Sequence, residues 1–240
     1  MGKLVSVIIP IYNEQEILRN SVERLLSDLE KVSCNFDFEL ILAENGSTDR
    51  TFEMGTELSE EFENVQIFQY PEPDYGKALK HGIEKARGDY IICDEIDLCL
   101  FEFYEKALKL LENDSADMII GSKTLSESTD DRPLGRRFAT SMLNFLLRIL
   151  LGFRGSDTHG LKAFIKEPVI PVVKKCLTGK DIFASELVIR AERSGNIRIT
   201  EIPVTLREKR PPSIRLFRRV PRVFMNLLYL FWVVRIKRDI

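Results

Sequence analysis

Histidine, cysteine and tryptophan are scarce in this 240-residue chain, which contains two, four and one of them respectively. The cysteines follow neither a zinc-finger nor a Cys-x-x-C spacing, which argues against a structural zinc site and against a dithiol redox centre. We therefore expect reduced structural thiols in a cytoplasmic protein. These are Cys34, Cys93, Cys99 and Cys176.

Long apolar runs and glycine-rich phosphate loops are also missing. No segment reaches the roughly 20 apolar residues that a transmembrane helix needs. The N-terminus passes straight into a strand-like run, so we expect no signal peptide. Neither Gly-x-Gly-x-x-Gly nor Gly-Lys-Ser/Thr occurs, which argues against the common dinucleotide and P-loop sites.

The composition is that of a globular protein, because 44% hydrophobic residues can form a sizeable core. The formal net charge is −2, but residues 206–240 contain ten Lys or Arg and only two acids, which leaves −10 on the rest. A basic arm of this kind is expected at an anionic surface. We predict one main domain over residues 1–215 and a basic, apolar C-terminal helix over 216–240.

Three carboxylates follow one short apolar run. Asp94, Glu95 and Asp97 come directly after the sequence YIIC. We interpret the run as a buried strand that ends at the edge where open α/β sheets bind ligands. Crowded acids repel one another, and hard oxygen ligands suit Mg²⁺ or Mn²⁺ carrying a diphosphate. A solvated acidic turn is the alternative for this segment.

Strand-like and helix-like segments alternate in the first hundred residues. Strands are expected at 5–10, 38–43, 65–70 and 90–93, and helices at 17–29 and 77–86. Asn13 and Glu16 resemble a capping box for the first helix. The alternation predicts a mostly parallel α/β sheet with helices on both faces. Its ligand edge should collect Tyr12, Glu14, Glu44, Asn45 and the acids at 94–97.

The later part of the chain contains one further predicted strand and two apolar stretches. Residues 197–206 form the strand, which Pro203 favours at a sheet edge. Residues 142–153 and 223–234 are the apolar stretches. The polar groups of 142–153 recur about once per turn, as in an interfacial helix. Residues 223–234 would span about 18 Å as a helix, short of the roughly 30 Å core of a bilayer, so this stretch should not cross a membrane. It suits an amphipathic helix at a membrane surface, or alternatively a helix docked on the domain or on another subunit.

Several blocks of sequence resemble the family 2 glycosyltransferases. They are VSVIIPIYNE (5–14), ENGSTDRT (44–51), GKA (76–78) and ARGDY (86–90). Later blocks resemble the polyprenyl-phosphate branch, typified by dolichol-phosphate mannose synthase. These are IGSK (120–123), DTHGLK (157–162) and ITEIPV (199–204). The resemblance implies a glycosyltransferase A-type (Rossmann-like) fold and inversion at the anomeric carbon of the transferred sugar.

The resemblance also implies roles for individual residues. The nucleotide-sugar site would include Pro10, Tyr12, Glu14, Glu44, Asn45, Lys77 and Asp94. Glu95 and Asp97 would hold the metal ion. Asp97 and Asp157 would be the catalytic residues, and Asp157 would act as a base or as an orienting group. Without the resemblance, Pro10 and Tyr12 would be a strand end and a packed ring, and Lys77 would be a surface lysine. The alternative for Lys77 is a functional one, because it lies at a predicted helix start where its ammonium group and the backbone N–H groups could bind a phosphate.

The chain departs from the family pattern at the predicted site. The family usually has two aspartates where this chain has Glu44 and Asn45, and Asp-Ala-Asp where it has Glu95-Ile96-Asp97. Cys99 occupies a position where dolichol-phosphate mannose synthases often have a metal-binding Gln. These departures leave open a nucleotide-sugar-binding protein with weak catalytic activity.

Basic residues indicate the chemistry of the acceptor. A neutral sugar acceptor needs few cations, whereas arginine offers paired donors to phosphate oxygens. The predicted phosphate-binding set is Lys123, Arg136, Arg137, Arg207, Arg210 and Arg215. Some of these charges are expected simply to lie on a solvated face. A lipid phosphate is already anionic, so its attack on the sugar needs little help from a general base.

These observations predict a peripheral, cytoplasmic membrane-associated enzyme that uses Mg²⁺ or Mn²⁺. It would transfer mannose or glucose from GDP-mannose or UDP-glucose to a polyprenyl or dolichyl phosphate. The alternatives are a family 2 enzyme that acts on a sugar hydroxyl or another lipid, and a non-catalytic nucleotide-sugar-binding protein. No nucleic-acid partner is expected, and the sequence leaves the oligomeric state open.

Overall fold

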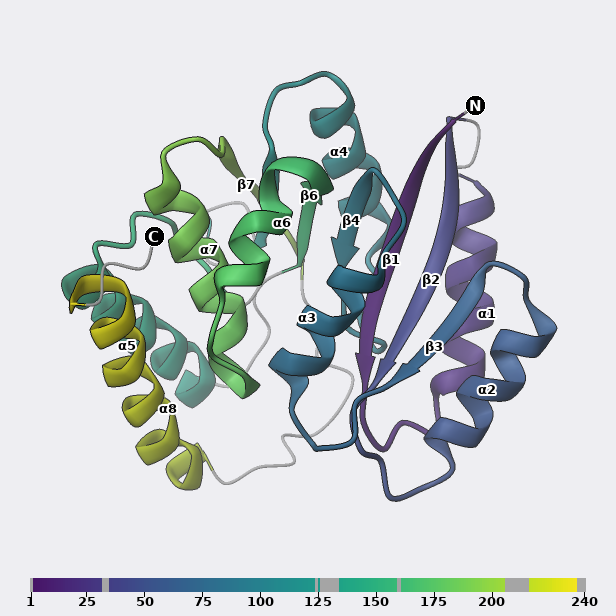
Figure 1. Cartoon of the computed structure of the whole chain (residues 1–240), viewed down its shortest axis with the longest axis horizontal. Coiled ribbons are helices and arrows are strands. Elements are labelled where there is room, and N and C mark those ends of the chain that lie inside the picture. Colours follow the sequence, from purple (N-terminus) through teal and green to yellow (C-terminus); the bar gives the residue numbers. More distant parts are fainter. Residues whose placement is uncertain are drawn as a thin grey trace.

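A seven-stranded sheet forms the centre of the computed structural model, which describes residues 2–31, 35–123, 125, 134–158, 161–205 and 216–236 (Figure 1). The strand order is β3-β2-β1-β4-β6-β5-β7. The strands are β1 (Lys3–Ile11), β2 (Phe36–Glu44), β3 (Val65–Gln69), β4 (Tyr90–Cys93), β5 (Met118–Ser122), β6 (Lys162–Ile165) and β7 (Ile199–Pro203). All paired strands are parallel except β6, which is antiparallel to β4 and to β5.

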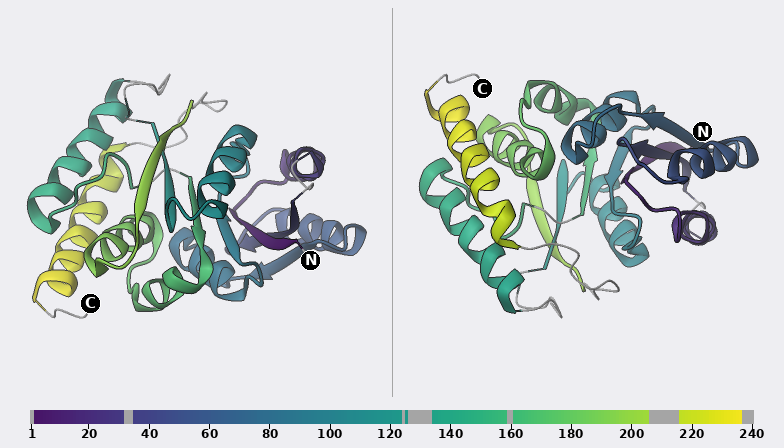
Figure 2. Two further views of the ribbon diagram at one scale, coloured as in Figure 1. Left: turned by 90° about the horizontal axis from the view of Figure 1, so that it is seen from above. Right: turned by 90° about the horizontal axis from the view of Figure 1, so that it is seen from below.

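Helices cover both faces of the sheet. One face packs against α1 (Leu18–Glu30), α2 (Thr51–Glu61) and α4 (Phe101–Glu112). The other packs against α3 (Tyr75–Lys85), α6 (Lys166–Lys175) and α7 (Phe183–Ser194), with the 3₁₀ turn η1 (Lys180–Ile182) just before α7. Beyond them α5 (Leu134–Leu151) and α8 (Leu216–Phe231), which continues into the π-helical turn η2 (Trp232–Ile236), lie side by side at one end of the molecule (Figure 2).

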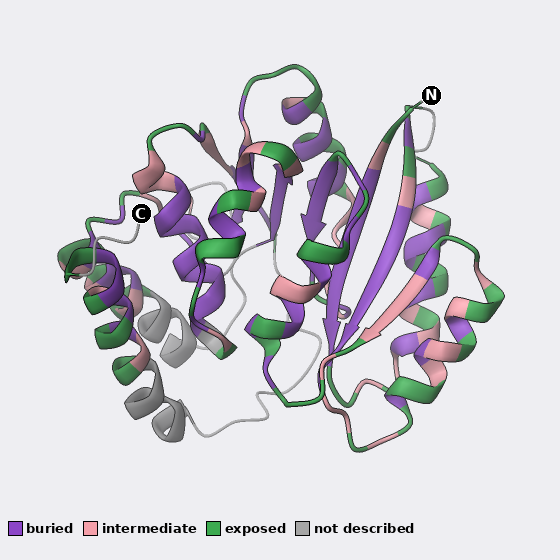
Figure 3. Cartoon of the chain, in the orientation of Figure 1, coloured by how far each residue is buried: buried purple, intermediate pink, exposed green. Residues whose placement is uncertain are grey.

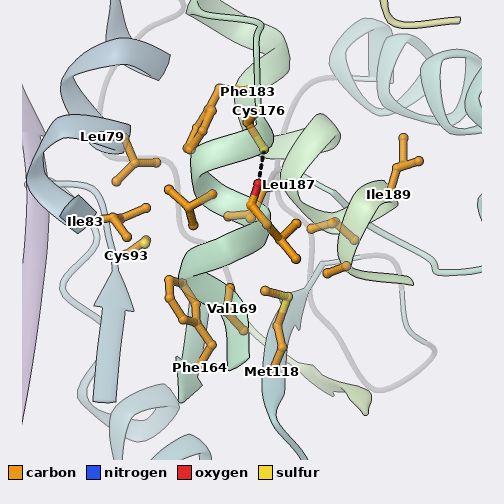
Figure 4. Packing of buried hydrophobic residues seen from close by; sticks show 14 of the residues in the cluster. Leu79, Ile83, Cys93, Met118, Phe164, Val169, Cys176, Phe183, Leu187 and Ile189 are labelled. Carbon is orange, nitrogen blue, oxygen red and sulfur yellow. Dashed lines mark hydrogen bonds between the residues drawn. The ribbon is translucent and has the colours of Figure 1, made fainter. Parts of the chain in front are cut away.

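The core explains why the strands appear in the sequence as short continuous apolar runs. In β1 every residue from Val5 to Ile11 is buried (Figure 3). Val7 and Ile9 join the cluster under α1, α2 and α4, whereas Ile8 joins the cluster on the opposite face. A strand buried on both faces is apolar throughout, because both sets of alternate side chains lie in the core. Figure 4 shows the second cluster, where side chains of α3, α6 and α7 meet over the sheet.

The structure confirms the predicted α/β architecture and shows which of the expected elements are present. The predicted strands in the first hundred residues correspond to β1–β4, and Pro203 ends β7 at the edge of the sheet as expected. The capping box is wrong, because α1 begins at Leu18 and its N-cap residue Ile17 makes no side-chain capping bond. The antiparallel strand β6 was not predicted.

The two apolar stretches form parts of α5 and α8, and both helices contribute to the core. Leu147 and Leu151 of α5, with Leu227 and Leu230 of α8, belong to the same buried cluster as α3 and α7. Other apolar side chains on these two helices stay exposed, including Phe145 and Met225. Within the described residues, no helix has both the length and the apolar character needed to span a bilayer.

Replacing Glu39 with glutamine is expected to lower the unfolding free energy mainly at neutral pH. Glu39 is 2% exposed, and its carboxylate accepts hydrogen bonds from Ser6 Oγ at 2.5 Å and from Arg87 N and Nε at 2.7 and 2.8 Å. Burial raises the pKa of Glu39, but these hydrogen bonds outweigh it and leave the pKa below its usual value of 4.5. The stabilisation is therefore complete above about pH 4.5 and is lost as the pH falls through the depressed pKa.

Urea unfolding of the wild type and of Glu39→Gln at several pH values measures this effect. We expect a difference of about 1–3 kcal/mol near neutral pH, because a buried partner loses its acceptor. The difference should shrink in acid. Glu63→Gln, which changes an exposed carboxylate, is the matched control. A difference that does not depend on pH would contradict the assignment.

Candidate active site

The parallel strands β1, β2 and β4 end at one edge of the sheet, and the loops that follow them carry most of the predicted nucleotide-sugar-binding and metal-binding residues (Figure 1). This edge is where open α/β sheets bind ligands. The N-terminus of α3 also lies at this edge, since β3 ends there and a short loop leads directly into the helix. The structure therefore brings the first three predicted blocks together.

Hydrogen bonds connect the loops after β1 and β2. Asn13 has a φ of 56°, and its Oδ1 accepts a hydrogen bond from Thr48 N at 2.8 Å. Asn13 N donates to Ser47 Oγ at 3.0 Å, and Glu14 N donates to Thr51 Oγ1 at 2.7 Å. Asn13 thus fixes one loop against the other, which is the role it has in place of the predicted helix cap.

Glu44 and Asn45 end β2 and have different roles. Glu44 is fully buried; its Oε1 accepts a hydrogen bond from Ser47 N, whereas Oε2 has no hydrogen-bond partner among the described residues. Such a buried acceptor suits a donor group on a ligand, because an unsatisfied carboxylate oxygen is costly. Asn45 Nδ2 donates to Ile11 O at 3.0 Å. An aspartate could not make that bond, which gives the departure from the family pattern a structural explanation.

Pro10 and Tyr12 lie at the end of β1. Pro10 pairs with Ala43 of β2, but β4 pairs with β1 only up to Ile8, so the missing N–H of Pro10 costs no ladder hydrogen bond with β4. Tyr12 is 43% exposed at the ligand edge. The alternative interpretation of Tyr12 as a packed core ring is therefore wrong.

The three acids after β4 are divided between the interior and the surface. Asp94 is 3% exposed; its Oδ2 accepts a hydrogen bond from Tyr104 Oη and its Oδ1 from Glu95 N, both at 2.6 Å. Burial is the main reason that the pKa of Asp94 is raised to about 7. These contacts favour an internal role in holding the loop, and nucleotide binding by Asp94 stays a prediction. Glu95 is exposed and Asp97 is half-buried.

Glu95 and Asp97 are the two carboxylates of this loop that can face a cation. Within the described ranges, no three His, Cys, Asp or Glu side chains are grouped closely enough to hold a metal ion by themselves. Mg²⁺ typically binds one or two carboxylates and takes its remaining ligands from water and substrate phosphates. The donor set therefore fits a hard divalent ion that arrives with a diphosphate.

The start of α3 differs from the expectation for Lys77. The Asp74 carboxylate accepts hydrogen bonds from Lys77 N at 2.9 Å and from Lys180 N at 2.6 Å. Asp74 therefore caps this helix and occupies the N–H of Lys77, while phosphate binding by the other N–H groups of the first turn stays a prediction. Lys77 Nζ lies 4.0 Å from Asp74 Oδ2 and 5.8 Å from the centre of the Tyr70 ring. Phosphate binding by this ammonium stays a prediction.

Tyr75 is a site residue that the sequence did not reveal. Its side chain is 36% exposed, and its hydroxyl lies close enough to the acids after β4 for their charges to affect its pKa. Burial, and then the negative charges of Glu95, Asp94 and Asp97, raise the pKa of Tyr75 well above its usual value. The hydroxyl is therefore protonated and can donate a hydrogen bond at this edge. The only signal in the sequence is its place beside Gly76.

Asp157 forms a buried ion pair with Lys123. Lys123 Nζ lies 3.5 Å from Asp157 Oδ2, and the two side chains are 9% and 1% exposed. Lys162 lies nearby, because β6 pairs it with Cys93, directly before the acids. Burial lowers the pKa of Lys162, although the charges of Cys93, Asp157 and Glu95 oppose this shift. Lys162 was also missed as a site residue, and its position in the DTHGLK block was the available signal.

Most of the predicted phosphate-binding cations lie outside the described residues. Arg207, Arg210 and Arg215 are in the undescribed segment 206–215, and His159 is also undescribed. Arg136 and Arg137 lie in α5, but their side chains are outside the described part. Lys123 is therefore the member of the predicted set whose surroundings are defined, and the roles of the others stay predictions.

Comparison with known families gives one match that covers most of the chain. The family described as Glycosyl transferase family 2 matches residues 6–170. That range begins in β1 and extends into α6, so it includes Glu44, the acids after β4 and Asp157.

Two curated relatives have related names. Glycosyltransferase AglD of Haloferax volcanii is 27% identical over 239 residues, which cover 98% of this chain and 38% of that protein. Dolichyl-phosphate beta-glucosyltransferase ALG5D of Trichomonas vaginalis is 28% identical over 218 residues, which cover 85% of this chain and 66% of that protein. The chain thus spans less than two thirds of the length of either relative.

Two solved structures share the fold. The mannosyltransferase PcManGT from Pyrobaculum calidifontis, solved in complex with GDP-Man and Mn²⁺, has a TM-score of 0.60 and 18% identity, over 99% of this chain and 65% of that one. Mannosyl-3-phosphoglycerate synthase from Rubrobacter xylanophilus has a TM-score of 0.62 and 13% identity, over 96% and 74% of the two chains. These similarities show a glycosyltransferase A-like fold for this chain.

Proposed function

Because this chain belongs to glycosyl transferase family 2, we propose that it transfers one hexose, mannose or glucose, from a nucleotide sugar to a polyprenyl or dolichyl phosphate. The transfer would invert the anomeric carbon and take place at the cytoplasmic surface of a membrane. The names of the dolichyl-phosphate beta-glucosyltransferase relatives support the class of acceptor. The observation that carries the proposal is the buried Lys123–Asp157 ion pair beside the acids at the end of β4.

The donor side of the site would bind the nucleotide and its diphosphate. The unpartnered Oε2 of Glu44 and the exposed ring of Tyr12 are suited to the base and ribose, with Pro10 and Glu14 beside them. Glu95 and Asp97 would hold Mg²⁺ or Mn²⁺. When bound, such an ion would neutralise negative charge on the departing diphosphate. The Tyr75 hydroxyl, whose pKa is raised partly by the charges of Glu95 and Asp97, would donate a hydrogen bond in the same region.

The acceptor side would orient an anion. A lipid phosphate carries the negative charge needed for attack on the anomeric carbon, so the main requirement is to position it. Lys123 and Lys162 supply two largely buried positive charges, and Asp157 pairs with the first. A charge–charge contact is stronger in such a poorly solvated site than in water. In this arrangement Asp157 orients Lys123, whereas a hydroxyl acceptor would require Asp157 as a true base.

A radiolabel transfer assay tests the proposal. Purified protein with Mg²⁺ or Mn²⁺ and a short-chain polyprenyl phosphate is given labelled GDP-mannose or UDP-glucose in parallel. Label that moves into the organic phase with one donor would support the reaction and identify the sugar. Transfer only to a sugar hydroxyl or to another lipid would favour a different family 2 acceptor. Nucleotide binding without any transfer would favour a weakly catalytic binding protein, for which Cys99 in place of the expected Gln is the motivating feature.

The outer surface of α5 and α8 is proposed as the contact with the membrane. Large apolar side chains on both helices are exposed: Met142, Phe145, Ile149, Phe224, Met225, Leu228, Tyr229, Trp232 and Ile236. The Tyr229 and Trp232 rings stack at 6.3 Å, and such rings favour the level of the lipid headgroups. Because α5 and α8 lie side by side, their exposed residues can form one apolar surface (Figure 2).

Replacing Met225 and Trp232 together with glutamate is expected to weaken binding to anionic lipid vesicles by at least about tenfold. The reason is that burial of each large apolar side chain contributes roughly 1.5–3 kcal/mol. Co-sedimentation with vesicles measures the effect. Leu177→Glu is the control, because Leu177 is 51% exposed but lies outside α5 and α8. Equal sedimentation of the double variant and the wild type would contradict the assignment.

A further inference from the structure

The short segment between α5 and β6 that carries Asp157 rests on one carboxylate from a distant strand. Glu201 lies on β7, more than forty residues further along the chain. Its Oε1 accepts a hydrogen bond from Ser156 N at 2.7 Å, and its Oε2 accepts one from Ser156 Oγ at 2.6 Å. Asp157 N is 3.4 Å from the same Oε1. Glu201 therefore holds both the main chain and the side chain of Ser156, the residue before Asp157.

The neighbouring glycine explains how the segment comes so close to the carboxylate. A Cβ atom added to Gly155 would lie 2.7 Å from Glu201 Oε1 and 2.7 Å from the Phe153 ring. Real Cβ atoms do not come this close to another heavy atom, so one of the two groups would have to move. Gly155 is therefore needed for the close approach, and any side chain there would displace the segment or Glu201.

Two further elements hold the same residue. Asn144 Nδ2 of α5 donates to Ser156 O at 2.6 Å, and the hydroxyls of Ser122 and Ser156 lie 2.6 Å apart. Ser122 ends β5, and Lys123 follows it. The contacts Ser122–Ser156 and Lys123–Asp157 thus lie next to each other along the two segments. A displacement of Ser156 would directly change the distance between Lys123 and Asp157.

We propose that Glu201 is a positioning residue that sets the geometry of the Lys123–Asp157 ion pair. This inference rests on the proposed function, which assigns that pair to the acceptor side of the site. Glu201 accepts its hydrogen bonds from Ser156 N, Ser156 Oγ and Asp157 N. It acts through the Ser156 backbone and hydroxyl, which it binds with both carboxylate oxygens. A displacement of about 1 Å at a reacting group can lower a rate about 100-fold.

Glu192 provides a matched control. Its two carboxylate oxygens accept hydrogen bonds from Arg154 N at 3.1 and 3.2 Å, so it binds the same segment two residues before Ser156. Glu192 also lies near Glu201, whose charge contributes to raising the pKa of Glu192 after the larger effect of burial. These hydrogen bonds connect Glu192 to Arg154, whereas Glu201 binds Ser156 and Asp157 directly. If the segment only required some carboxylate beneath it, removing the charge of Glu192 and removing the charge of Glu201 would have equal effects.

The experiment compares Glu201→Gln, Gly155→Ala and Glu192→Gln with the wild type. The ε-methylene NMR signal of Lys123 and the transfer rate are both measured. In Glu201→Gln and Gly155→Ala we expect the signal to move toward its position in Asp157→Asn, and kcat to fall about 100-fold with unchanged nucleotide affinity. In Glu192→Gln both readouts should stay close to the wild type.

The two readouts separate this inference from the proposed function. An unmoved Lys123 signal in folded Glu201→Gln would overturn the inference, even if the wild type transfers sugar to the lipid. A moved signal with no transfer by the wild type would support the positioning role and reject the proposed reaction. Equal changes in Glu192→Gln, or a matching loss of nucleotide affinity, would show a general structural role and also overturn it.

Discussion

Replacing Asp97 with asparagine is expected to lower sugar transfer by at least about 100-fold. Asp97 is one of only two carboxylates that face outward on the loop after β4, since Asp94 is buried against Tyr104. Asparagine keeps the shape but removes the negative charge that a hard divalent ion requires. Removing one preorganised electrostatic group from an active site typically costs two to three orders of magnitude.

The transfer assay and a nucleotide-binding titration with Mn²⁺ measure this effect. Under the proposed enzymatic function, turnover should nearly disappear while some nucleotide binding remains. Glu102→Gln is the control, because Glu102 is an exposed acid in the first turn of α4, five residues beyond Asp97. Wild-type turnover in Asp97→Asn would remove Asp97 from the site and would favour a different set of metal ligands.

The second large effect is expected at the Lys123–Asp157 ion pair. Lys123→Met and Asp157→Asn should each lower kcat/KM for the lipid phosphate about 100-fold. The first change removes a cation, and the second leaves a nearly buried cation without its partner, which is costly. The double variant should be little worse than either single one, because residues that act as a unit are not additive.

A double-mutant cycle on kcat/KM for the acceptor, with KM for the donor measured in parallel, provides the test. Lys109→Met is the control for loss of an exposed lysine, since Lys109 lies on the outer side of α4. Donor KM should change little in all variants. Strictly additive losses would mean that the two residues act separately, and Asp157 would then be better explained as a general base.

Local sequence patterns predicted β1–β4, and β1, β2 and β4 contain continuous runs of buried residues because helices cover both faces of the sheet there. β3, an edge strand, is only partly buried. The antiparallel β6 escaped prediction although three of its four residues are buried. It is only four residues long, and it begins with Lys162, a charged residue that a strand-core pattern does not include. Its place between β4 and β5 depends on pairing with residues far away in the sequence.

The three acids after β4 illustrate the limit of a motif. The sequence placed Asp94, Glu95 and Asp97 together at the correct edge of the sheet. It did not show that Asp94 is buried whereas Glu95 and Asp97 are not. This difference depends on Tyr104, which lies on α4 and donates a hydrogen bond to Asp94 in the interior. Asp74 is a similar case. Its carboxylate caps α3 by accepting from Lys77 N and also accepts from Lys180 N, 106 residues away, which no local pattern contains.

The sequence by itself determined strands β1–β4 and β7, helices α1 and α3, the edge that carries the polar loops and the family resemblance, since these depend on local periodicity and short motifs. The tertiary structure decided which polar groups are internal and which face a ligand. That choice follows from burial: a polar group is stable in the interior only with a partner, and the partners of Asp94, Ser156 and Lys123 come from separate elements. The positioning role proposed for Glu201 arises in the same way, from a contact that no local pattern contains.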